Sequence, residues 1–167
     1  LPIIYNCSGY EKVDSLKRLE GIVDVYLPDF KYYDTMLGKK FSNVKNYSDI
    51  AKECIEWMYN QGKKVIVRHL VLPSHTEDSK KILKYLYGRY KNNIYYSIMG
   101  QYTPMLKNDG IEKYEELKRK LTKREYEKVI IIFCIKCLSS SFSKRRIERL
   151  YNNVSSSSSV LKKCPRN

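Results

Sequence analysis

One stretch, Lys64 to Asp78, constrains the fold more than any other part of the chain. Its sequence, KVIVRHLVLPSHTED, indicates a buried strand from Val65 to Leu72 with apolar side chains on both faces. Pro73 ends the strand, and a helix is predicted to start at Thr76. A strand followed at once by a helix is the repeating unit of a parallel α/β sheet.

Arg68 and His69 interrupt this apolar run. A buried strand rarely carries an unpaired guanidinium, and parallel sheets bind their ligands at the carboxyl ends of strands. Arg68 is therefore a candidate site residue, although an Arg that simply pairs with a nearby carboxylate explains the sequence equally well. His69 is more typical of a packing histidine.

The rest of the first 132 residues repeats the same alternation. Further strands are predicted at Pro2–Cys7, Ile22–Asp29 and Ile94–Met99. Helices are predicted at Glu11–Leu19 and from a cap at Ser48 to Gln61. Two more are predicted to start at Thr76 and after a capping box formed by Thr122 and Glu125. A longer connection is predicted over Phe30–Lys45. Four such strands predict an α/β domain with a parallel sheet. They are too few to close a barrel of six or eight strands, so a closed barrel would need further sequence.

Composition separates this domain from a tail. The chain has 167 residues, enough for one domain, and its first residue is Leu1, so we expect sequence upstream. Residues 133–167 have serine clusters and half of the net charge of +14, so we expect a disordered, basic tail. Because the remaining charges mingle along helix faces, the basic excess is discounted as evidence for nucleic acid. The chain has no apolar run long enough to cross a bilayer, and a cytoplasmic location is expected.

Polar residues collect at the predicted strand ends. Asn6 follows the first strand, Asp29 and Lys31 the second, and Tyr102 the fourth, while Arg68 lies within the third. Because parallel strands share one carboxyl edge, these residues predict a binding site for a small polar ligand. Cys134 and Cys137 form a C-x2-C pair, but without a second pair this spacing does not predict a metal site. The sequence has no Gly-rich phosphate loop and no pattern that identifies a catalytic residue.

Three runs together resemble the radical S-adenosylmethionine superfamily, in the branch similar to pyruvate formate-lyase activating enzyme. They are PIIYNCSGYEKVDSLKRLEGIVDVYLPDFKYYD, VIVRHLVLPSHTEDSKKIL and YYSIMGQYTPM, and the resemblance spans about residues 1–130. It implies a partial (β/α)6 barrel, of which this chain would hold the third to sixth strands. It also implies cofactor-binding roles for five residues: Asn6, Asp29, Lys31, Arg68 and Tyr102.

The chain departs from that family in ways that matter for its activity. Ser74 and Gly100 stand where the family has Gly and Asn. The C-x3-C-x2-C loop that holds a 4Fe–4S cluster is absent, as is the segment that binds the amino group of S-adenosylmethionine. The resemblance therefore implies the carboxyl-terminal part of such an enzyme, and we expect this chain alone to hold neither cofactor and to be inactive.

The intact enzyme would cleave S-adenosylmethionine reductively to a 5′-deoxyadenosyl radical. A glycyl-radical-type protein substrate and an electron donor are the partners that the resemblance implies. Two other interpretations stay open from the residues alone. One is a non-enzymatic basic module that binds nucleic acid, and the other is an α/β enzyme with a different small ligand.

Overall fold

The structure, a computed structural model, describes residues 1–104, 113–138 and 159–162. Its centre is a sheet in which four parallel strands follow one another in sequence order, β1 (Ile4–Cys7), β2 (Val25–Pro28), β3 (Lys64–Leu70) and β4 (Tyr95–Met99). A fifth strand, β5 (Ser159–Lys162), pairs antiparallel with β4 at the edge. The predicted parallel α/β sheet is confirmed.

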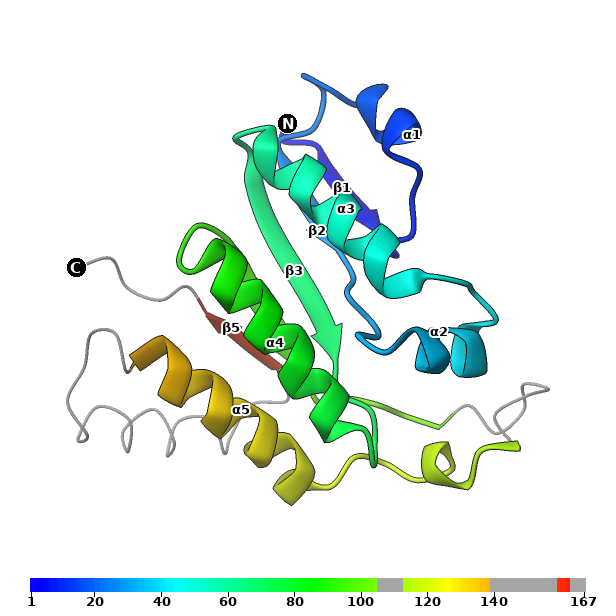
Figure 1. Ribbon diagram of the computed structural model, residues 1–167. Helices are drawn as coiled ribbons and strands as arrows, with labels where there is room; N and C mark the ends of the chain where they lie inside the picture. The colour runs from blue at the N-terminus through cyan, green and yellow to red at the C-terminus, as the bar shows by residue number, and fades with distance from the viewer. Residues whose placement is uncertain (105–112, 139–158, 163–167) are drawn as a thin grey trace.

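Helices cover one face of this sheet. The helices of the described residues are α1 (Val13–Lys17), α2 (Thr35–Ser42), α3 (Tyr47–Asn60), α4 (Thr76–Tyr90) and α5 (Lys123–Leu138), with a short 3₁₀ helix, η2 (Glu115–Leu117). In Figure 1, α3, α4 and α5 lie in front of the strands. Right-handed crossovers between neighbouring parallel strands place their helices on the same side. The opposite face, which we call the open face, therefore has no helix over it in the described part of the chain.

The burial pattern along the strands follows from this one-sided cover. In β3, Val65, Val67 and His69 point toward the helices and are buried, whereas Ile66, Arg68 and Leu70 are only half-buried. β4 alternates in the same way. Tyrosines fill much of the core beneath the helices, and Tyr26, Tyr47, Tyr90 and Tyr96 are almost completely buried.

Two boundaries differ from the predictions. The predicted connection over Phe30–Lys45 contains α2, whose N-cap Asp34 accepts a hydrogen bond from the Met36 amide at 2.8 Å. α3 begins at Tyr47, with Asn46 rather than Ser48 as its N-cap. Only the Asp34 side chain makes a capping hydrogen bond, since Asn46 has left-handed backbone and makes none.

The predicted tail begins later than residue 133. α5 continues to Leu138 because Phe133 and Cys134 are buried against the core, which corrects the expectation that the ordered domain ends at Ile132. β5 also lies within the predicted tail. The rest of that tail, 139–158 and 163–167, lies outside the described residues. No helix in the described part of the chain is long and apolar enough to span a membrane.

The start of α5 is held by the predicted capping box. The Glu125 amide donates to the Thr122 hydroxyl at 3.2 Å, and the Thr122 amide donates to the Glu125 carboxylate at 3.0 Å. The same carboxylate accepts from the Ser74 amide at 2.8 Å and pairs with Arg119 at 2.7 Å. These contacts hold the pKa of Glu125 well below its usual range, and the hydrogen bond from Arg119 has the largest effect. Glu125 thus ties α5 to the turn that follows β3.

Candidate functional site at the carboxyl ends of the strands

Three of the predicted site residues meet on the open face. Arg68 donates from Nε to Asp29 Oδ1 at 2.8 Å and from Nη2 to Asn6 Oδ1 at 2.7 Å. The shortest distance between the Arg68 guanidinium and the Asp29 carboxylate is 2.7 Å, an ion pair. Asn6, Asp29 and Arg68, here called the strand-end cluster, come from the ends of β1, β2 and β3.

Strand register creates this cluster. Asp29 forms an isolated parallel bridge to Arg68, and the Phe30 amide donates to the Arg68 carbonyl at 2.8 Å. On the other side, the Asp29 amide donates to the Cys7 carbonyl at 2.9 Å. Because side chains alternate along a strand, this register puts all three polar side chains on one face.

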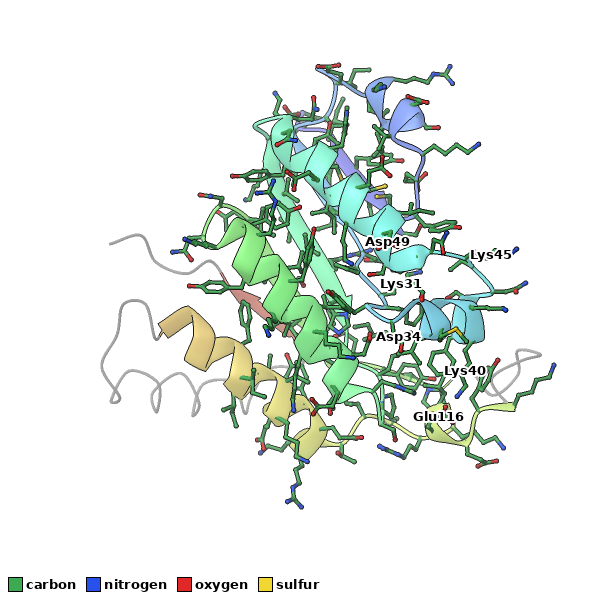
Figure 2. All side chains as sticks on the ribbon, in the orientation of Figure 1. Lys31, Asp34, Lys40, Lys45, Asp49 and Glu116 are labelled. Atoms are coloured by element: carbon green, nitrogen blue, oxygen red, sulfur yellow. The ribbon has the colours of Figure 1, made fainter. Side chains whose placement is uncertain are left out.

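A cavity of about 330 Å³ lies beside the strand-end cluster. Asp29, Lys31 and Arg68 line one part of it, and the remaining lining is mostly apolar: Tyr32, Leu70, Leu72 and Met99. Its volume is at the small end of the range for ligand pockets, which combine an apolar lining with a few polar groups. Figure 2 shows Lys31 and Asp34 between α2 and the end of β3. The cavity suits a small ligand with charged and apolar parts.

Tyr102, the fifth predicted residue, is held apart from this cluster. Its hydroxyl donates to the Leu117 carbonyl at 2.9 Å, and it is not among the residues that line the cavity. Burial raises its pKa, and the nearby Tyr32 adds to the effect. The structure thus brings together Asn6, Asp29, Lys31 and Arg68 but not Tyr102.

Tyr47 fixes the loops that carry the site, a role that the sequence did not reveal. Its buried hydroxyl shares its one hydrogen between the carbonyls of Ser8 at 2.8 Å and Asp29 at 3.1 Å, and it accepts from the Lys31 amide at 3.0 Å. Burial raises the pKa of Tyr47, so the hydroxyl stays protonated and able to donate. One side chain of α3 therefore joins the loops after β1 and β2.

Gly9 and Asp78 hold the same two loops. Gly9 has φ +72°, and a Cβ atom there would lie 2.1 Å from the Asp29 carbonyl oxygen. Only glycine allows this approach. In the first turn of α4, the Asp78 carboxylate accepts from the amides of Tyr33 at 2.9 Å and Asp34 at 2.8 Å. Burial raises the pKa of Asp78 despite these two hydrogen bonds.

The histidine beside Arg68 points away from the site. His69 is buried on the helix-covered face, and its Nδ1 lies 2.7 Å from the Phe30 carbonyl oxygen. Burial lowers its pKa to about 4, so the ring is neutral and Nδ1 donates this hydrogen bond. Its Nε2 has no hydrogen-bond partner among the described residues. His69 is thus a packing histidine, as its position in the strand indicated.

The cysteines do not converge in the part of the chain that the structure describes. Cys7 is half-buried, Cys54 is buried and donates from Sγ to the Glu11 carbonyl at 2.9 Å, and Cys134 is buried in α5. Burial raises the pKa of the Cys7 thiol to about 11. Within the described ranges, no three His, Cys, Asp or Glu side chains are placed to hold a metal ion.

The chain is similar to a protein whose role is not established. No known family profile matches the chain. Over 131 residues the chain is 35% identical to an uncharacterized protein of Methanocaldococcus jannaschii, and the match covers 78% of this chain. It covers 37% of that protein, so the chain spans little more than a third of its relative's length.

Proposed function

We propose that this chain is the carboxyl-terminal part of a radical S-adenosylmethionine enzyme resembling pyruvate formate-lyase activating enzyme, and that its strand-end cluster binds part of S-adenosylmethionine. The observation that carries the proposal is the meeting of Asn6, Asp29 and Arg68 beside a cavity at the carboxyl ends of successive parallel strands. The proposed architecture is an incomplete (β/α)6 barrel whose interior is the open face.

The residues present fit S-adenosylmethionine, which carries a carboxylate, an amine, a sulfonium and ribose hydroxyls. Both contacts of Arg68 with Asp29 fall on Oδ1, so within the described part of the chain Oδ2 is left to accept from an amine or a hydroxyl. Lys31, at the same cavity, can donate to a carboxylate. Leu70, Leu72 and Met99 give an apolar wall against which a base or a methylene chain can pack.

The described residues do not fit the iron–sulfur cluster. A 4Fe–4S cluster needs thiolates close together, whereas Cys7, Cys54 and Cys134 lie on β1, α3 and α5. In this proposal, residues outside the chain hold the cluster. Bound to such a cluster, S-adenosylmethionine would supply a 5′-deoxyadenosyl radical for hydrogen abstraction from a cytoplasmic partner, a glycyl-radical-type protein, after reduction by an electron donor.

The test is calorimetric binding of S-adenosylmethionine to the protein extended upstream so that it includes cluster cysteines. Alanine at Asp29, Lys31 or Arg68 should each weaken binding by about 1–3 kcal/mol, because charge-assisted hydrogen bonds are lost. Lys63→Ala, at an exposed lysine on the turn before β3, is the matched control and should leave the affinity unchanged. Equal affinity in all four variants, or no binding by the extended protein, would refute the proposal.

A further inference from the structure

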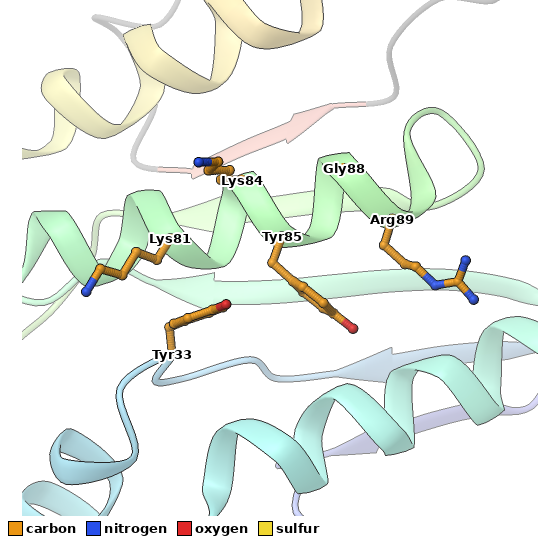
Figure 3. Close-up of a pocket in the computed structure, with 6 residues that line it drawn as sticks. All are labelled: Tyr33, Lys81, Lys84, Tyr85, Gly88 and Arg89. Atoms are coloured by element: carbon orange, nitrogen blue, oxygen red, sulfur yellow. The ribbon is translucent and has the colours of Figure 1, made fainter.

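A second hollow lies on the helix-covered side of the molecule, away from the open face. It has a volume of about 610 Å³ and lies along α4 where this helix faces α3 and the loop after β2. Figure 3 shows the side chains that line it, with the two tyrosine rings between α4 and the elements below it. We call it the α4 groove; its lining residues are Tyr33, Lys81, Lys84, Tyr85, Gly88 and Arg89.

Sequence spacing on α4 builds one wall of the groove. Lys81, Lys84, Tyr85 and Gly88 occupy positions i, i+3, i+4 and i+7, so they share one face of the helix. Ile82, Leu83 and Leu86, on the other side of α4, are buried in the core. The groove face of α4 is therefore distinct from its packing face, and Lys81 and Lys84 take no part in packing the core.

Gly88 keeps the groove open. A Cβ atom added there would meet nothing within 4 Å, so the position is not glycine for lack of space. Glycine within a helix costs about 0.5–1 kcal/mol of stability relative to alanine. Its presence on the groove face removes a side chain that would otherwise project into the hollow.

Lys52 positions the two tyrosine rings of the groove. The Tyr33 and Tyr85 ring centroids lie 6.4 Å apart, and Lys52 Nζ lies 4.4 Å from the first and 5.3 Å from the second. Cation–π contacts of this length hold both rings in place from the α3 side. The two tyrosine rings therefore form a preformed aromatic surface beside the exposed Lys81 and Lys84.

The charges around the groove are unequal. Arg89 is paired with Glu56, and Lys52 lies 3.5 Å from Asp49. Within the described residues, neither Lys81 nor Lys84 forms such an ion pair. Lys81 is close enough to the Asp78 carboxylate to lower its pKa, and the two exposed lysines give this face of α4 a positive charge beside the tyrosines. A carboxylate-bearing ligand with aromatic or apolar side chains complements this surface.

We infer that the α4 groove binds an acidic segment of a partner protein, with its carboxylates at Lys81 and Lys84 and an aromatic or apolar side chain on Tyr33 and Tyr85. A nucleic acid fits less well, because its affinity comes from many cations along the phosphate chain, whereas the groove is lined by three, of which Arg89 is paired with Glu56. The inference is independent of the proposed cofactor site. Tyr33 nonetheless belongs to the loop that carries Asp29 and Lys31, so the partner would dock beside the segment that forms that site.

The experiment is a fluorescence-anisotropy titration of the full chain with a labelled synthetic peptide of alternating glutamate and tryptophan. The expected result is saturable binding that weakens with salt, and loss of at least about tenfold in affinity in Lys81→Glu/Lys84→Glu. Lys12→Glu/Lys63→Glu has the same net charge and alters exposed lysines elsewhere, so it should change affinity less than about threefold.

Gly88 provides a second test that leaves the charge unchanged. Gly88→Phe should reduce binding by filling the groove, whereas Gly88→Ala should bind normally and raise the melting temperature. Equal losses in the two charge variants, or binding unaffected by Gly88→Phe, would overturn the inference. Tighter binding of a single-stranded oligothymidylate that is lost in the same variants would also overturn it, in favour of a nucleic-acid partner.

Discussion

Arg68 and Asp29 occupy matching positions on neighbouring parallel strands, with their backbones bridged and their side chains 2.7 Å apart. About a quarter of the Arg68 side chain and a fifth of the Asp29 side chain are exposed. An ion pair in such a position is neither fully screened nor fully desolvated, so its contribution must be measured by a double-mutant cycle.

We predict a coupling free energy of about 1–2 kcal/mol between Asp29→Asn and Arg68→Met, since partly buried pairs exceed the range of exposed ones. Urea unfolding of the wild type, the two single variants and the double variant measures it. The exposed pair of Lys17 with Asp14 is the control, with an expected coupling below about 0.5 kcal/mol. Additive effects at Asp29 and Arg68 would show that the pair contributes nothing to the fold.

Tyr47→Phe should destabilise the chain by about 2–3 kcal/mol, because it leaves buried partners on two loops without their hydrogen bond. Tyr10→Phe is the matched control, since the Tyr10 hydroxyl makes a single exposed hydrogen bond to the Lys45 carbonyl. It should cost less than about 1 kcal/mol. Similar losses in both variants would mean that Tyr47 is not the junction of the two loops.

Gly9→Ala should cost at least about 3 kcal/mol, because the added methyl would overlap the Asp29 carbonyl and the backbone is left-handed. Gly21 has a similar φ of +78° but no atom within 4 Å of an added Cβ. Gly21→Ala should therefore cost only about 1 kcal/mol. The difference between the two, measured by thermal unfolding, reports the steric contact alone, and equal costs would contradict the close approach.

His69 should make stability depend on pH between about 4 and 6.5. In the folded chain its pKa is lowered to about 4 by burial, against an ordinary 6.5 when unfolded. Between these values the unfolded state binds the extra proton, so the free energy of unfolding falls as the pH falls, by up to about 3 kcal/mol. His69→Asn should lose this part of the slope. An unchanged slope in urea titrations of the variant would show that other groups cause it.

The candidate site shows how far the sequence could predict the structure. Polar residues at successive strand ends correctly indicated that Asn6, Asp29 and Arg68 would lie close together, because the pattern of a parallel sheet fixes where its strands end. Tyr47 and Asp78 were missed because each acts through backbone groups far away in sequence, which no local pattern records. Tyr102 lies apart because its hydroxyl meets Leu117, a contact made by η2.

The helices show the same division. The long helices α3 and α4 have apolar periodicity and were predicted, whereas α2 is short, contains Gly38 and buries little. Its Asp34 cap was the signal that could have revealed it. The domain was expected to end at Ile132 because the basic, serine-rich composition farther along obscured the apolar side chains of Phe133 and Cys134, which are buried in α5.

Glu125 has a consequence for how the molecule opens. Its carboxylate caps α5 and at the same time accepts the Ser74 amide, which lies in a turn with φ +64°. Unwinding the first turn of α5 therefore breaks the hydrogen bond of the Ser74 amide, and we expect the two events to share one local-opening equilibrium. Amide hydrogen exchange at Ser74 should then follow that of the first residues of α5 instead of that of β3, although Ser74 is much closer in sequence to the strand.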